Sequence, residues 1–98
     1  MTFEIILVFF LSYISGSIPF GLILTKLFLG KDIREIGSKN IGATNVLRAG
    51  NKFIATLTLF LDISKGVAPV LITNYYFPNL IYLSGLMAFL GHIFPIWL

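Results

Sequence analysis

One short loop holds most of the residues in this chain whose types and spacing could do chemistry. Residues 37–48 read Gly-Ser-Lys-Asn-Ile-Gly-Ala-Thr-Asn-Val-Leu-Arg. The side chains that can donate hydrogen bonds, apart from Lys39 and Arg48, are those of Ser38, Asn40, Thr44 and Asn45. Backbone amides in a glycine-bearing turn hold anions, and a guanidinium offers a planar fork of donors that matches phosphate oxygens. The pattern therefore predicts a phosphate site.

The backbone of this loop supports the same prediction but leaves an alternative open. Gly37 and Gly42 allow sharp turns and a close approach to a ligand. If residues 43–48 open a helix, its first turn adds positive charge at the anion. The alternative is a polar turn with a capping Thr or Asn. The loop is neither a Walker A loop nor a dinucleotide fingerprint, because it lacks Gly-Lys-Ser/Thr and no strand precedes it.

Composition decides which solvent surrounds the loop. The chain has 98 residues, of which 57% are hydrophobic and 11% are charged, whereas soluble domains carry about 25% charged residues. Because a chain this short cannot bury this much apolar surface in a water-soluble core, we expect an all-α integral membrane protein. The absence of cysteine excludes disulfides and thiolate metal sites. Nucleic acid is not an expected partner, because the basic residues flank apolar spans and the aromatic residues lie mostly within those spans.

Three apolar stretches are long enough to cross a bilayer, at roughly 3–29, 53–77 and 80–98. We therefore expect a single membrane domain over 1–98, with three transmembrane helices. Loop 30–52 carries five of the seven Lys and Arg residues, which predicts a cytoplasmic loop and an N-terminus outside. A cleaved signal peptide at 1–20 is not expected, since its start carries Glu4 and no basic residue.

The first span is rich in small residues and contains Pro19. Small residues let helices pack closely in a membrane, and proline interrupts a helix. One interpretation is a packing seam. The other is a bent helix that admits a substrate beside it. The small residues concerned are Ser12, Ser15, Gly16, Ser17 and Gly21.

Ionisable residues inside the other spans have two interpretations each. Asp62 and Lys65 are three residues apart, so they share a helix face and can pair, or they can border a polar cavity. His92 is the sole histidine and suits either hydrogen-bonded packing or catalysis. It has no second histidine or cysteine with which to build a metal site.

Five ordered blocks extend these signals over almost the whole chain. They are Ser17-Ile18-Pro19-Phe20-Gly21, Asp32-Ile33-Arg34, the 37–48 loop, Asp62-Ile63-Ser64-Lys65-Gly66 and Gly91-His92-Ile93-Phe94-Pro95. With these blocks the chain closely resembles the N-terminal half of the bacterial acyl-phosphate:glycerol-3-phosphate acyltransferases. Lys39 stands where that family more often has glycine.

The resemblance implies an enzyme of the bacterial inner membrane. It would move a fatty acyl group from acyl phosphate to glycerol 3-phosphate, the first acyl step of phospholipid synthesis, with no cofactor and no metal. Membrane lipid is the other implied partner. By the same match, Ser38 and Arg48 would be the catalytic residues at the reacting phosphates. Substrate-binding residues would be Asn40, Gly42, Thr44 and Asn45, and His92 and Lys65 are further candidates.

The resemblance also implies that the chain is truncated and forms the N-terminal part of a larger helical bundle. Family members are roughly twice this length and carry two later motifs, so we expect little activity from these residues alone, or a separate chain that supplies the remainder. The alternative classes are a non-catalytic small membrane protein, as a vestigial product or an assembly partner, and a phosphate or phospholipid carrier.

Overall fold

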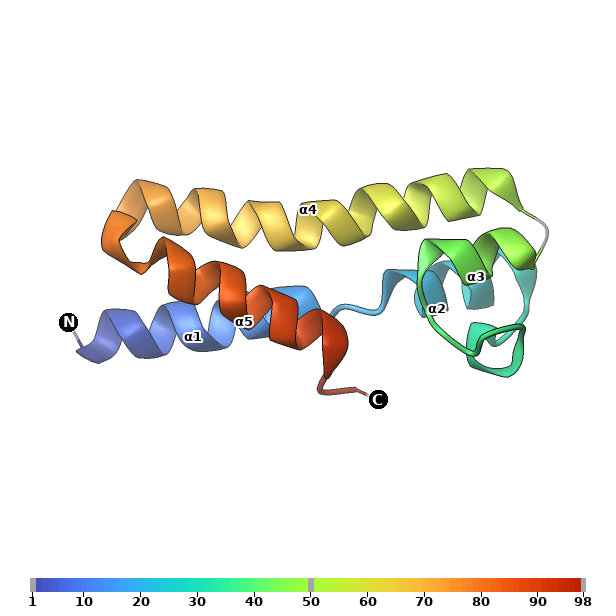
Figure 1. Cartoon of the computed structure of the whole chain (residues 1–98), viewed down its shortest axis with the longest axis horizontal. Helices are drawn as coiled ribbons and strands as arrows, with labels where there is room; N and C mark the ends of the chain where they lie inside the picture. The colour runs from blue at the N-terminus through green and yellow to red at the C-terminus, as the bar shows by residue number, and fades with distance from the viewer. Residues whose placement is uncertain (1, 50, 98) are drawn as a thin grey trace. The chain divides into compact units, whose positions relative to one another are not determined.

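A computed structural model describes residues 2–49 and 51–97, and the described residues are helical with no strand (Figure 1). The elements are α1 (Thr2–Ser17), α2 (Phe20–Leu24), a π-helix η1 (Thr25–Leu29), a 3₁₀ turn η2 (Ile33–Glu35), α3 (Ala43–Arg48), α4 (Lys52–Tyr76), a 3₁₀ turn η3 (Pro78–Leu80) and α5 (Ile81–Ile93). The all-α expectation is confirmed.

Two of the expected spans agree with the helices. Thr2–Leu29, taken as one run, and Lys52–Tyr76 are long and apolar enough to cross a membrane. At ~1.5 Å per residue, 25 residues of α4 reach about 37 Å, more than the ~30 Å hydrocarbon layer. Large side chains exposed along these helices suit a lipid solvent, among them Phe3, Phe10, Leu59, Phe60 and Leu71.

The third helix is shorter than expected. Residues 80–98 were expected to form it, but α5 begins at Ile81 and ends at Ile93. The stop has a local cause, because Phe94 precedes Pro95 and a residue before proline avoids the helical region. Residue 98, the expected end, lies outside the described residues.

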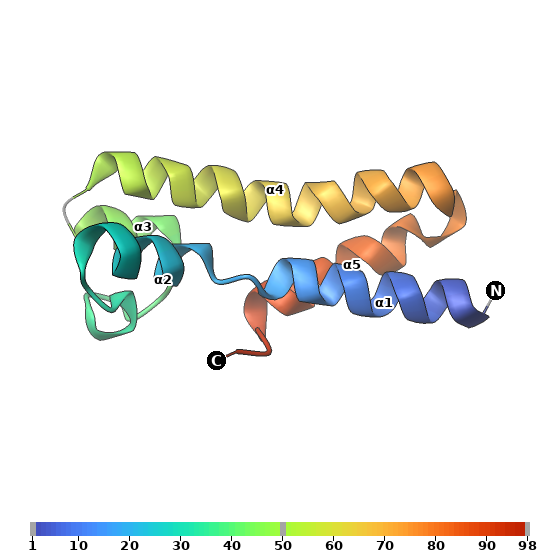
Figure 2. The same ribbon diagram turned by 180° about the vertical axis from the view of Figure 1, so that it is seen from behind.

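The chain divides into two compact units, which we call the helical unit (1–18 and 63–98) and the loop unit (19–62). In the helical unit α1 and α5 lie side by side, as both views show (Figures 1 and 2). Backbone touches backbone there, since a Cβ on Gly16 would overlap the carbonyl of Ala88. The hydroxyls of Ser12 and Ser84 share a hydrogen bond of 2.8 Å across the same contact. These contacts confirm the predicted packing seam.

The interruption predicted in the first span is also present. Helix α1 ends at Ser17 and α2 begins at Phe20, with Pro19 between them. A proline has no N–H and cannot continue the helical ladder, so the sequence supplies the cause of the break.

The loop unit has its own small core. It packs Leu22 and Leu24 of α2 against Ile33, Val46 of α3, and Ile54 and Ala55 of α4. Gly21 allows α2 to approach the loop, because a Cβ there would overlap the carbonyl of Ile41. The apolar side chains of this core pack against the 37–48 segment, so the polar groups of the segment can remain at the surface.

Candidate functional site

Asn45 organises the 37–48 loop from inside. Its side chain is 1% exposed, and its Nδ2 donates to the carbonyls of Ile33 (3.1 Å), Ile36 (2.7 Å) and Asn40 (2.8 Å). Its Oδ1 accepts from the backbone N–H of Ser38 at 3.2 Å. An amide nitrogen has two hydrogens, so one of the three donations is shared. All its hydrogen-bonding groups face protein, which gives Asn45 a loop-shaping position.

Two residues of the loop adopt left-handed backbone. Gly37 has φ +55° and Lys39 has φ +65°. Gly37 also has no room for a side chain, because a Cβ would overlap Oδ1 of Asn45. Lys39 occupies a conformation that glycine adopts without cost, which explains physically why glycine would suit that position. These turns place the N–H of Ser38 and the carbonyl of Asn40 against the side chain of Asn45.

The remaining polar residues of the loop are exposed around this centre. Ser38, Lys39, Asn40, Thr44 and Arg48 all present their side chains at the surface. The Oγ of Ser38 accepts a long hydrogen bond of 3.4 Å from the N–H of Asn40. The aliphatic part of Arg48 runs beside Gly37, since its Cδ would lie 3.5 Å from a Cβ there. The loop therefore exposes two hydroxyls, an amide and two cations.

Gly42 begins the short helix α3, as the sequence allowed. It is the N-cap, with an extended backbone, and its carbonyl accepts from the N–H of Val46. The first N–H groups of any helix have no partner within it, and here they belong to Ala43, Thr44 and Asn45. This arrangement adds backbone donors next to the exposed side chain of Thr44.

An ion pair lies just before the loop, and the sequence analysis gave it no role. Arg34 donates from Nε and Nη2 to the two carboxylate oxygens of Asp32, at 3.0 and 2.7 Å. Hydrogen bonds from the Arg34 side chain, and then from its backbone N–H, lower the pKa of Asp32 from 3.8 to about 2. The spacing Asp-x-Arg was the available signal, because Asp32 caps the 3₁₀ turn that contains Arg34.

The other two candidates lie in the helical unit. Lys65 is 6% exposed, and its Nζ donates to the carbonyl of Ile18 at 2.9 Å. His92 is exposed in the last turn of α5. A catalytic part for either residue stays a prediction, as does a pairing of Asp62 with Lys65.

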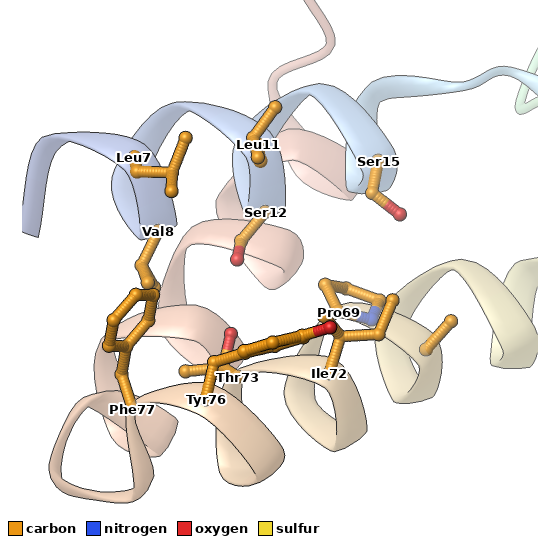
Figure 3. Close-up of a pocket in the computed structure, with 11 residues that line it drawn as sticks. Leu7, Val8, Leu11, Ser12, Ser15, Pro69, Ile72, Thr73, Tyr76 and Phe77 are labelled. Carbon is orange, nitrogen blue, oxygen red and sulfur yellow. The ribbon is translucent and has the colours of Figure 1, made fainter. Parts of the chain in front are cut away.

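The helical unit also holds an apolar cavity of about 450 Å³ between α1 and α4 (Figure 3). Apolar side chains, with the hydroxyls of Ser12, Ser15 and Thr73, line it, and no charged residue is among them. It is therefore unsuited to phosphate chemistry. Among the residues that the structure describes, no three His, Asp or Glu side chains gather as a metal site requires.

Comparison with known proteins identifies the family of the chain. Residues 6–98 match the glycerol-3-phosphate acyltransferase family. The chain is 60% identical over 95 residues to a glycerol-3-phosphate acyltransferase of Pelagibacter ubique, covering 97% of this chain and 50% of the relative. It is 55% identical over 98 residues to one of Mesorhizobium japonicum, covering 100% and 50%. The chain thus spans about half the length of the curated relatives it matches.

A solved structure shares the fold. The crystal structure of PlsY (YgiH), an integral membrane glycerol 3-phosphate acyltransferase in its glycerol 3-phosphate form, superposes with a TM-score of 0.86 at 40% identity. The match covers 95% of this chain and 48% of that one. Our chain has an integral membrane fold, and it belongs to the glycerol-3-phosphate acyltransferase family.

Proposed function

We propose that this chain forms the N-terminal, phosphate-holding part of an acyltransferase that uses acyl phosphate and glycerol 3-phosphate. The products are 1-acylglycerol 3-phosphate and inorganic phosphate. One observation carries the proposal: around the buried Asn45, the loop turns hydroxyl, amide, ammonium and guanidinium donors outward in a chain of this family. The glycerol 3-phosphate named for the solved relative is an anion that suits such a surface.

The roles of the loop residues follow from their positions. The guanidinium of Arg48 pairs with phosphate oxygens, and Ser38 and Thr44 donate their hydroxyls beside it. Asn40 contributes its exposed side-chain amide and Gly42 its backbone amide, and Asn45 holds the turn that carries them. Lys39 adds a further cation at the surface.

The reaction needs no covalent protein intermediate. Acyl phosphate is already activated, so the protein has to position the two substrates and stabilise the charge of the leaving phosphate. The attacking hydroxyl oxygen forms an ester bond with the acyl carbon, and the bond from that carbon to the phosphate oxygen breaks. The proton of the hydroxyl passes to a substrate phosphate, which leaves as inorganic phosphate.

We further propose that the loop faces the cytoplasm of a bacterial inner membrane, with the N-terminus outside. The support is the placement of five basic residues in 30–52, against none in the turn at 75–79. Because the chain matches only half of its relatives, residues equivalent to their second half would complete the site, in the same chain or in a separate one.

The test joins residues 1–98 to the second half of the Pelagibacter ubique relative and measures phosphate release from palmitoyl phosphate. Arg48→Ala should lower kcat/KM by about tenfold or more, since a charge-assisted hydrogen bond contributes about 1.5–3 kcal/mol and 1.4 kcal/mol is tenfold. Arg34→Ala is the matched control, because that guanidinium is already engaged by Asp32. Equal effects of the two substitutions would reject the phosphate site.

A further inference from the structure

A proline in α4 leaves one backbone carbonyl of that helix open to an outside donor. In a regular helix the N–H of residue 69 donates to the carbonyl of residue 65, but residue 69 is proline and has no N–H. The Oγ of Ser15, on α1, donates to this carbonyl of Lys65 at 2.7 Å. Figure 3 shows Ser15 and Pro69 on facing walls of the apolar cavity.

The same lysine sends its side chain back to α1. Its ammonium donates to the carbonyl of Ile18 at 2.9 Å, one residue beyond the end of the helix. The next residue is Pro19, so this carbonyl lies at the break between α1 and α2. The two hydrogen bonds run in opposite directions between the last turn of α1 and one residue of α4. We call this pair of contacts the proline clasp.

The charge of Lys65 suits its position for two reasons. The carbonyl end of a helix carries partial negative charge, so a cation there is stabilised. A buried ammonium within a membrane span is costly unless polar groups face it, and backbone carbonyls at an interruption supply such groups. The residue is 6% exposed, so the contact is made away from water.

We infer that Lys65 is a positioning residue, which holds the break in the first span through the proline clasp. The chain continues from this break through α2 to the loop at 37–48, so the proline clasp fixes the point at which that continuation starts. Any consequence for catalysis rests on the proposed function, whereas the clasp itself does not.

The sequence offers a unique label for the contact. Ile18-Pro19 is the one Ile-Pro pair in the chain, so carbonyl-¹³C isoleucine with ¹⁵N proline selects the carbonyl of Ile18. Adding ¹⁵Nζ lysine allows solid-state dipolar recoupling between that carbonyl and the ammonium in bilayers. The wild-type chain should show strong dephasing at the short range of a direct hydrogen bond. No dephasing would overturn the inference without any need for a variant.

Substitutions then separate charge from bulk. Lys65→Met should shift the Ile18 carbonyl resonance, and Lys65→Arg should leave it near its wild-type position because the donor returns. Lys31→Met, which removes an exposed ammonium elsewhere, is the control and should cause no shift.

Pro69→Ala restores an N–H that competes for the carbonyl of Lys65, so Ser15→Ala should have a smaller effect on unfolding in that background. Equal effects in both backgrounds would contradict the clasp.

In the fused enzyme described above, Lys65→Met should lower kcat by about tenfold or more with little change in KM, and Lys65→Arg should restore most of it. An unchanged kcat in Lys65→Met would overturn the positioning role. All fused enzymes, including the one with the wild-type sequence, could lack turnover while the dephasing between Lys65 and Ile18 is still observed. That result would reject the proposed function but not the proline clasp.

Discussion

At the scale of single residues, Asn45 decides the shape of the candidate site. Its side chain makes four hydrogen bonds that tie residues 33–40 to α3. Removing its amide would leave three carbonyls and one N–H without that partner, in a place closed to water. The exposed donors of the loop depend on this buried one for their arrangement.

We therefore expect Asn45→Asp to be at least as harmful as Asn45→Ala, although it is nearly isosteric. The carboxylate would face the three carbonyl oxygens, and the N–H of Ser38 would be too little to stabilise its buried charge. Either substitution should cost about 2 kcal/mol or more, since each unsatisfied buried group costs about 1–3 kcal/mol. Amide hydrogen exchange over 33–48 measures the loss. Protection equal to wild type in the Asp variant would show that the amide donors do not hold the loop.

The Asp32–Arg34 pair gives the loop a dependence on acid. The pKa of Asp32 falls from 3.8 to about 2 in the folded chain, so the pair is fully present above pH 3.8. Its contribution to stability is lost as the pH falls from there through about 2. Arg34→Ala should return the pKa toward 3.8, which carboxyl ¹³C titration measures. A midpoint near 2 in that variant would assign the shift to another group.

At the scale of elements, hydropathy and proline positions predicted the spans and the interruption of the first span, but they did not predict where every helix ends. The spans at 3–29 and 53–77, and the interruption at Pro19, follow from composition and covalent geometry alone. The early end of α5 was missed because hydropathy over 80–98 was followed past Pro95, although a residue before proline avoids the helical region. The π-helix Thr25–Leu29 has no comparable signal among its residues. In the loop, glycines and donors predicted an anion surface. They could not separate Asn45 from its neighbours, because its partners are chosen by the folded path of the backbone.

The contact between α1 and α5 offers a matched pair of substitutions. Gly91→Ala would put a Cβ onto the carbonyl of Tyr13 and 2.9 Å from the nitrogen of Ser17, so it should cost about 1–3 kcal/mol through overpacking. Gly66→Ala, in α4, meets no atom within 4 Å and should stabilise the helix by about 1 kcal/mol. Denaturation in mixed micelles, followed by circular dichroism, compares them. Similar effects would mean that α1 and α5 do not pack this closely.

At the scale of the whole molecule, the loop and the helices point to an incomplete site. The loop exposes hydroxyl, amide and cationic side chains that suit phosphate. The helices expose large apolar side chains, which lipid or further helices can cover. Relatives carry about as many residues again beyond the shared half. These facts together favour assembly with a second half.

We therefore expect residues 1–98 alone, in lipid vesicles, to release little phosphate from palmitoyl phosphate and glycerol 3-phosphate. Co-expression with the second half of the Pelagibacter ubique relative should raise the rate, because membrane helices insert first and can associate afterwards through small-residue contacts. The same second half with the Arg48→Ala chain is the control and should stay slow, which ties the gain to the loop. Full turnover by residues 1–98 without a partner would show instead that donors within this half suffice for both positioning and proton transfer.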